Sequence, residues 1–194
     1  LDNAMAREMG GGDSFCMQTK DQAVRDYKNG RWDLLYTNSE NAIQWISENL
    51  AFTPFPDWIN TFKDKVRFRE LIRPLFPNYF FKEIKRAELG DLDKEELSYP
   101  LIFKPAVGFF SMGVYKLYAP EDWLTIEEQL QKEFAETGHL YPPEVFDGST
   151  FIIESLIEGR EFAMDAYYDE NGEAVILNIM EHFFSSDADV SDRL

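Results

Sequence analysis

Cysteine is almost absent from this sequence, since Cys16 is the only one in 194 residues. A lone thiol excludes a disulfide framework and a cysteine metal centre within the chain, and Cys16 is interpreted as a small buried apolar residue. No uninterrupted apolar run has the length of a membrane span, and no signal-peptide pattern is visible. The sequence therefore predicts a cytoplasmic protein with no membrane partner.

Positive charge is also scarce. Lys and Arg number 19 against 36 Asp and Glu, which gives a formal net charge of −17. Nucleic acids and anionic membranes select a net positive face, so neither is an expected partner. A small anionic ligand stays compatible with this composition if a few cations gather at one place. The 44% hydrophobic and 15% aromatic residues can supply a core, for one large domain or two small ones.

The first fifty residues follow an α–β–α order. We expect a helix over residues 22–27, a short buried strand over residues 32–36 and then a second helix. Units of this kind build parallel sheets. Pro54 and Pro56 are expected to end the second helix and to begin a linker. That helix is predicted from candidate N-cap residues and apolar residues at helical spacing: Asn38, Ser39, Ala42, Ile43, Ile46 and Leu50.

A further helix is predicted over residues 62–74, with Lys65 on its apolar face. A cation in the first turn opposes the helix dipole, so this lysine either extends its ammonium into solvent or meets an anion. Both readings stay open from the residues alone. A short strand over residues 79–81 and an acidic connector over residues 89–97 follow. The apolar stripe of the helix consists of Phe68, Leu71, Ile72 and Leu75.

The most informative stretch is an apolar strand that ends at Lys104. Ile102 and Lys104 share one face of this strand, and a desolvated ammonium needs an anion. A loop bounded by Gly108 and Gly113 follows, before a second strand over residues 114–118. Backbone N–H groups of such a loop can cradle phosphate oxygens. A plain hairpin tip is the alternative, and the Walker A order of loop then lysine is not present.

A second predicted strand, over residues 151–154, ends in an acidic residue. After a helix marked by Trp123, Ile126, Leu130 and Phe134, residues 151–154 read as an apolar strand closed by Glu154. Glu161 opens a hairpin of residues 161–168 and 174–179, with an Asn-Gly turn between them. Either acid could accept hydrogen bonds from a ligand or form an ordinary salt bridge.

The order of these features resembles the ATP-grasp enzymes over about residues 30–194. The segments that carry the likeness are Lys-Asp-Lys-Val around Lys65, Tyr-Pro-Leu-Ile-Phe-Lys-Pro around Lys104, the glycine loop, and Ile-Ile-Glu-Ser-Leu-Ile-Glu-Gly-Arg-Glu-Phe from Ile152. Among these enzymes, the sequence looks most like the carbamoyl-phosphate synthetase large chain and small ATP-grasp ligases. The spacing of the four segments along the chain, with Glu161 seven residues after Glu154, strengthens the likeness.

The resemblance implies a nucleotide-binding role for ten positions. The two lysines match the basic positions that contact ATP phosphates, and the glycine loop matches the mobile loop that closes over them. The strand end at Glu154 matches the hinge that reads adenine, and Glu161 matches the acid that holds the ribose hydroxyls. The implied residues are Lys65, Lys104, Gly108, Ser111, Met112, Gly113, Glu154, Ser155, Ile157 and Glu161.

The resemblance also implies the fold. We expect an α/β fold with an α+β lid, in which a Rossmann-like pre-ATP-grasp domain (residues 1–52) precedes a helical linker (53–97). The lid (98–158) and the start of a C-terminal subdomain (159–194) follow. Both ends are expected to be incomplete. The metal ligands are expected beyond Leu194, and none is assigned within the chain. His182 is a candidate for the substrate site, with a structural role as the alternative.

By this likeness the chain is expected to be an ATP-dependent carboxylate–amine ligase that uses Mg²⁺ or Mn²⁺. Its small-molecule carboxylate and amine are not identified, and a homodimer is left open. The first alternative is an ATP-grasp-like module that binds nucleotide without catalysis. The second is an acidic interaction domain whose lysines pair with surface acids.

Overall fold

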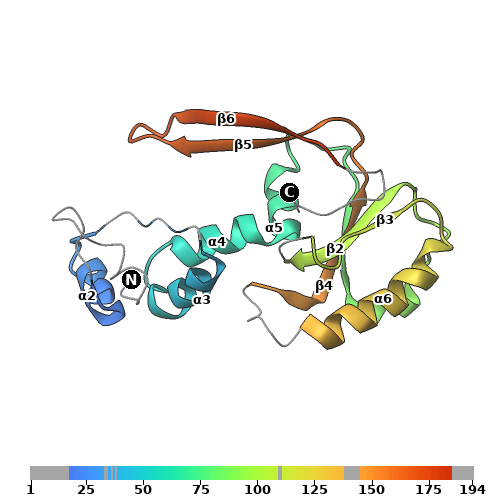
Figure 1. Cartoon of the computed structure of the whole chain (residues 1–194), viewed down its shortest axis with the longest axis horizontal. Helices are drawn as coiled ribbons and strands as arrows, with labels where there is room; N and C mark the ends of the chain where they lie inside the picture. The colour runs from blue at the N-terminus through green and yellow to red at the C-terminus, as the bar shows by residue number, and fades with distance from the viewer. Residues whose placement is uncertain are drawn as a thin grey trace. The chain divides into compact units, whose positions relative to one another are not determined.

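The computed structural model describes residues 18–32, 35, 37, 39–108, 111–137 and 145–184. It divides into two compact units, Leu1–Ile59 and Asn60–Leu194, and Figure 1 shows the elements of each. The predicted four-part domain division stays a prediction. Most of the strand predicted over residues 32–36 lies outside the described residues, as does Cys16.

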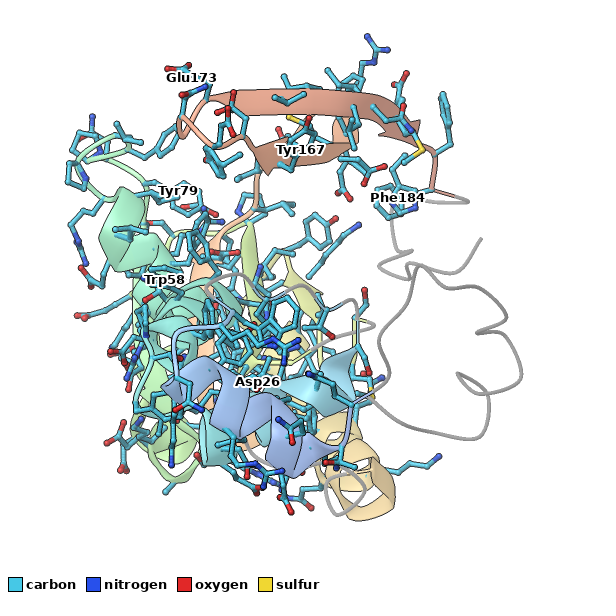
Figure 2. All side chains as sticks on the ribbon, turned by 90° about the vertical axis from the view of Figure 1, so that its left-hand side faces the viewer. Asp26, Trp58, Tyr79, Tyr167, Glu173 and Phe184 are labelled. Carbon is cyan, nitrogen blue, oxygen red and sulfur yellow. The ribbon has the colours of Figure 1, made fainter. Side chains whose placement is uncertain are left out.

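The first unit contains two predicted helices. Helix α2 (Lys20–Lys28) begins after Thr19, whose hydroxyl accepts a hydrogen bond from the backbone N–H of Gln22. Asp26, labelled in Figure 2, is a buried acid on this helix and is bound by the Gln18 and Gln22 side chains. Helix α3 (Glu40–Asn49) confirms the second predicted helix. Ser39 is its N-cap residue but makes no side-chain capping bond, and Asn38 lies outside the described residues.

In the segment after α3, two predicted helix boundaries are wrong. Helix α4 (Phe55–Lys63) begins where a proline linker was expected, because a proline in the first turn lacks only an N–H that the helix would leave unpaired. The helix predicted over residues 62–74 is interrupted at Asp64, which caps a new helix, α5 (Lys65–Ile72). The carboxylate of Asp64 accepts from the backbone N–H groups of Val66 and Arg67. Capping by Asp64 therefore makes Lys65 the first residue of its helix.

Four antiparallel strands form the main sheet, in the order β1-β4-β2-β3. They are β1 (Phe81–Lys85), β2 (Leu101–Val107), β3 (Tyr115–Leu117) and β4 (Asp147–Ser155). The predicted strand over residues 79–81 is misplaced, because only Phe81 belongs to β1. The strand predicted to end at Lys104 continues to Val107, since Pro105 and Val107 still pair with β4 on either side of a register shift. A 3-10 helix (Arg86–Asp91) overlaps the start of the predicted acidic connector.

One face of this sheet is the core of the second unit. Phe103 stacks on Phe151 at 4.7 Å between ring centroids and meets the edge of Trp123 at 5.0 Å. Trp123 belongs to α6 (Asp122–Thr137), whose predicted apolar positions 123, 126 and 130 are buried. The side chain of Phe134 lies outside the described residues. The core cluster is Ile84, Leu89, Leu101, Phe103, Leu117, Trp123, Ile126, Leu130, Phe151 and Ile153.

The alternation along the two central strands sends the other side chains to the opposite face. Leu101 and Phe103 of β2 enter the core, so Ile102 and Lys104 lie on the far side. In β4, Phe151 and Ile153 enter the core, and Glu154 lies on the same far side as Lys104. Because Ile102 pairs with Glu154 and Lys104 pairs with Ile152, the lysine and the glutamate are diagonal neighbours on one face.

Strands β5 (Glu161–Tyr168) and β6 (Ala174–His182) form the predicted hairpin. Its turn is fixed by the Asp169 carboxylate, which accepts from the backbone N–H groups of Asn171 and Glu173. Strand β6 is longer than predicted and reaches His182, opposite Glu161. Many side chains of the hairpin are exposed to solvent, among them Tyr167, which Figure 2 labels. None of the helices in the described ranges is long and apolar enough to span a bilayer.

Candidate functional site

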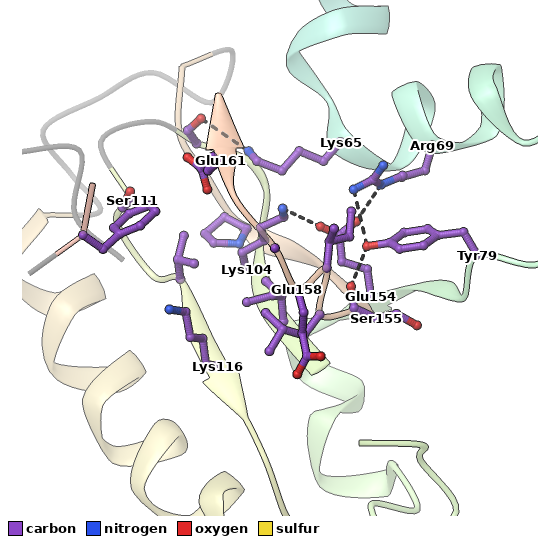
Figure 3. Close-up of a pocket in the computed structure, with 18 of the residues that line it drawn as sticks. Lys65, Arg69, Tyr79, Lys104, Ser111, Lys116, Glu154, Ser155, Glu158 and Glu161 are labelled. Atoms are coloured by element: carbon purple, nitrogen blue, oxygen red, sulfur yellow. Dashed lines mark hydrogen bonds and ion pairs between the residues drawn. The ribbon is translucent and has the colours of Figure 1, made fainter. Parts of the chain in front are cut away.

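A pocket of about 920 Å³ opens on the sheet face that does not form the core. Figure 3 shows its lining, which comes from α5, β2, β3 and the end of β4, from the loop after β2 and from the segment that enters β5. Tyr79 and Phe184 complete it. Gly113 and His182 are not lining residues. The predicted site residues that line the pocket are Lys65, Lys104, Gly108, Ser111, Met112, Glu154, Ser155, Ile157 and Glu161.

Glu154 lies at the centre of the charged groups in this pocket. Its side chain is 4% exposed and contacts two cations, the Arg69 Nε at 2.6 Å and the Lys104 Nζ at 2.5 Å. Burial raises the pKa of this carboxyl, but the Arg69 hydrogen bond and the Lys104 charge outweigh burial, so its pKa lies below 4.5. A doubly paired carboxylate therefore stays ionised although it is buried.

Lys65 lies across the end of β2. Its Nζ is 3.5 Å from the carbonyl oxygen of Ala106 and 3.4 Å from that of Gly108, so it donates only weakly to the backbone. Burial and the charges of Lys104 and Lys63 lower the pKa of Lys65 to about 8. The ammonium therefore lines the pocket and is not extended into bulk solvent, which was one of the two readings of this residue. An anion that entered the pocket would relieve its electrostatic cost.

Arg69 and Tyr79 also line the pocket, although neither was predicted from the sequence. The Arg69 guanidinium lies over the Tyr79 ring at 4.5 Å, and the Tyr79 hydroxyl donates to the carbonyl oxygen of Ser155 at 2.6 Å. Burial and the nearby Glu154 charge raise the pKa of Tyr79 to about 12, so the hydroxyl stays a donor. Arg69 follows Lys65 by one helical turn. That spacing was the available signal that both cations face the same way.

The glycine loop can be described only in part, because Phe109 and Phe110 lie outside the described residues. Ser111 has a positive φ of 53° and lines the pocket beside Gly108. Gly113 has a φ of 68°, which favours glycine at this position although the residue is not in the lining. The loop therefore turns sharply on both sides of Met112.

Glu161 and His182 face each other at the open end of the hairpin. The His182 Nδ1 lies 3.3 Å from a carboxylate oxygen of Glu161, and the imidazole packs on the Phe184 ring at 4.2 Å. Glu161 and Phe184 line the pocket. His182 therefore contacts Glu161, a lining residue, without lining the pocket itself. Its predicted role at the substrate site is not tested by this position.

Metal ligands were expected beyond Leu194. In the part of the chain that the structure describes, no group of three or more His, Cys, Asp or Glu residues could hold a metal ion. Glu154, the most buried acid of the pocket, is already paired with two cations. We therefore assign no metal ligand to the described residues.

Comparison with known proteins places residues 97–194 in a family described as the ATP-grasp domain. Two curated D-alanine–D-alanine ligases, from Anaplasma marginale strains Florida and St. Maries, are each 30% identical over 132 residues. Each match covers 62% of this chain and 36% of the relative, so the chain spans about a third of the length of these relatives.

Solved structures add a likeness of fold. The L-amino acid ligase from Bacillus licheniformis is 22% identical with a TM-score of 0.54, and the match covers 84% of this chain and 38% of that one. The VanG D-Ala:D-Ser ligase from Enterococcus faecalis is 22% identical with a TM-score of 0.47, covering 68% and 35%. The family match over residues 97–194 confirms the predicted superfamily, and the likeness to the L-amino acid ligase agrees with the predicted mixed helix–sheet class. The finer likeness to the carbamoyl-phosphate synthetase large chain stays a prediction.

Proposed function

The chain belongs to the ATP-grasp domain family, and from this premise we propose that it binds ATP in the pocket of Figure 3 and uses it in a carboxylate–amine ligation. The observation that carries the proposal is the convergence of two lysines and two glutamates. Lys65, Lys104, Glu154 and Glu161 come from separate elements and line one pocket. The whole lining holds four cations, Lys65, Arg69, Lys104 and Lys116, against three glutamates. In a chain with a net charge of −17, this local excess of cations favours a small anionic ligand over a polyanion.

The triphosphate is proposed to lie between α5 and the glycine loop. The ammonium groups of Lys65 and Lys104 would neutralise phosphate oxygens there, and the loop around Ser111 would close over them. The weak backbone contacts of Lys65, at 3.4 and 3.5 Å, support this proposal because a phosphate offers a stronger acceptor. Closure of the loop would exclude water from the reacting groups.

The adenosine is proposed to lie at the end of β4. The backbone of Ser155 and Ile157 would read the adenine edge, with the Glu154 carboxylate near the exocyclic amine, and Glu161 would accept hydrogen bonds from the ribose hydroxyls. Ile157 is 69% exposed, so an adenine ring placed against it would cover apolar surface. The hydrogen bond from Tyr79 to Ser155 supports this assignment because it fixes the backbone next to the proposed contact.

The reaction proposed has two steps. An oxygen of a substrate carboxylate attacks the γ-phosphorus of ATP, the bond to the β-phosphate oxygen breaks, and ADP and an acyl-phosphate result. The nitrogen of an amine then attacks the acyl carbon, phosphate leaves, and the nitrogen loses a proton to give an amide. Mg²⁺ or Mn²⁺ is the metal expected in the family, where it would neutralise the β- and γ-phosphates. The described residues offer no cluster for it, so we assign it no step.

The substrates proposed are amino acids. The curated relatives are named as ligases of D-alanine with D-alanine, and the fold neighbour as an L-amino acid ligase. The carboxylate of one amino acid and the amine of a second would then serve as the reacting groups. A carbamoyl-phosphate synthetase-like reaction would use bicarbonate as the carboxylate, so the two versions of the proposal differ in the acid that is phosphorylated.

Trapping of the acyl-phosphate tests this proposal. The protein is incubated with ATP, magnesium, hydroxylamine and single amino acids, and the hydroxamate and ADP are quantified. An amino-acid hydroxamate in amounts equal to the ADP is the expected result. Binding of ATP without any ADP would instead identify a non-catalytic nucleotide-binding module, and bicarbonate-dependent ADP release without amino acids would favour the synthetase-like version.

A further inference from the structure

The two oxygens of the Glu154 carboxylate have different cations. Arg69 Nε donates to Oε2 at 2.6 Å, and Lys104 Nζ contacts Oε1 at 2.5 Å. Both cations are about one-fifth exposed, at 19% and 20%, whereas the glutamate side chain is 4% exposed. The carboxylate is therefore the buried member of the cluster, and its two partners share its charge.

The two cations differ in how firmly the protein holds them. Arg69 packs over the Tyr79 ring at 4.5 Å, its Nη2 lies 3.5 Å from the Tyr79 hydroxyl, and that hydroxyl is bonded to β4 at Ser155. A planar guanidinium held in this way is suited to a buried ion pair. Lys104 contacts the carboxylate through one ammonium on a flexible stem and faces the pocket. Lys104 is consequently the cation that a ligand can withdraw.

Withdrawal of Lys104 has an electrostatic consequence for Glu154. If Lys104 were its sole partner, a phosphate that took the ammonium would leave a buried carboxylate unpaired, which is strongly unfavourable. Because Arg69 stays bonded to Oε2, the carboxylate remains paired while Lys104 turns toward the ligand. The fixed cation thereby lowers the free energy needed to make the mobile one available.

We propose that Arg69 is a positioning residue, the resident counter-ion of Glu154 that frees Lys104 for an anionic ligand. This inference rests on the proposed binding of a phosphate-bearing ligand in the pocket. It assigns Arg69 no contact with the ligand. Loss of the guanidinium would make Lys104 the only cation of Glu154, so the ligand would have to break a buried ion pair before it could bind.

A double-mutant cycle with Arg69→Met and Glu154→Gln tests this role. Affinities for ADP and for inorganic tripolyphosphate are measured by calorimetry. Tripolyphosphate has no adenine, so a contact between Glu154 and adenine cannot affect its binding. Arg69→Met is expected to weaken binding of both probes by about tenfold, within the range of coupling between groups of one ion network. In the Glu154→Gln background the same substitution is expected to have no effect, because no carboxylate charge remains to be compensated.

Arg73→Met is the matched control, since Arg73 lies on the solvent side of the same segment and pairs with Glu70. It is expected to bind both probes as the wild type does. If Arg69→Met does not fold, Arg69→Lys replaces it and is expected to give a smaller loss that Glu154→Gln again abolishes. An unchanged affinity in Arg69→Met, or an equal loss in both backgrounds, overturns the inference; the second result would mean that Arg69 contacts the anion itself. If the wild type binds neither probe, the proposed function fails and the inference with it.

Discussion

Lys104 and Glu154 are diagonal neighbours on two paired strands, and their side chains meet at 2.5 Å on the pocket face of the sheet. The pairing of β2 with β4 places a cation proposed to hold phosphate beside an acid proposed to lie near adenine. In the ligand-free protein the two groups therefore neutralise each other. A ligand that separates them must supply a better partner for the lysine, which a phosphate does.

The first prediction concerns Lys104. Lys104→Ala is expected to weaken binding of ATP or ADP about tenfold or more, because a hydrogen bond between charged groups contributes about 1.5–3 kcal/mol. Lys116→Ala, on the pocket wall at β3, is expected to have a clearly smaller effect. Calorimetric titration measures both, with the exposed Lys82→Ala on β1 as the control. Equal losses in the three variants would contradict the phosphate role of Lys104.

The second prediction concerns Lys65 and stability. Its pKa in the folded protein is about 8 against a usual 10.5, so the folded state disfavours the charged form. The unfolded chain binds more protons between these two values, and stability should rise with pH through that window. Lys65→Met removes the buried charge and is expected to raise the free energy of urea unfolding near pH 7 while it weakens nucleotide binding.

The gain in stability from Lys65→Met should shrink between about pH 8 and pH 10.5, the two pKa values of the lysine. Lys82→Met is the control, because Lys82 is exposed on β1, and its effect on the unfolding free energy is expected to be the same at pH 7 and pH 10.5. A gain that is the same at pH 7 and pH 10.5 would show that packing of the methionine, and not relief of a buried charge, is responsible.

The third prediction concerns Glu154 and acid unfolding. Its folded-state pKa lies below the usual 4.5, so the stability that its ion pairs provide is present above pH 4.5 and is lost as the pH falls through the folded value. Glu154→Gln is expected to make the free energy of unfolding less dependent on pH below 4.5. Urea unfolding between neutral and acidic pH measures this. Parallel pH profiles for the variant and the wild type would contradict the prediction.

The fourth prediction concerns Tyr79. Tyr79→Phe keeps the ring under Arg69 but leaves the carbonyl of Ser155 without its donor, so a loss of about 1 kcal/mol in unfolding free energy is expected. The affinity for ADP should also fall, because the backbone beside Glu154 loses its anchor. Tyr168→Phe on the hairpin, where the side chain is 78% exposed, is the control and should change neither quantity.

The elements that the sequence predicted well are those with a strong local signal. The hairpin of β5 and β6 has an Asn-Gly turn between alternating strands, and the buried stripe of α6 repeats at helical spacing. Alternation along β2 also placed Ile102 and Lys104 correctly on one face. Local pattern was sufficient because each of these features depends on neighbours in sequence.

The errors have physical causes, one of which is a local helix cap and the others contacts between distant segments. The carboxylate of Asp64 caps a new helix at Lys65 and so separates α5 from α4, and pairing with β4 extends β2 beyond Lys104. Arg69 was missed because its partner, Glu154, is 85 positions away along the chain. An ion pair of that separation is created by the sheet and by α5, and only a tertiary structure reveals it.

The proposed function depends most directly on whether the chain binds ATP between Lys65 and Lys104. Calorimetric titration of the wild type and of the Lys65→Ala/Lys104→Ala double variant with ADP measures this, with folding of both checked by circular dichroism. We expect saturable binding of one ADP per chain to the wild type and no detectable binding to the folded double variant. Absence of binding to the wild type, or equal affinity in the two proteins, would contradict the proposed nucleotide site.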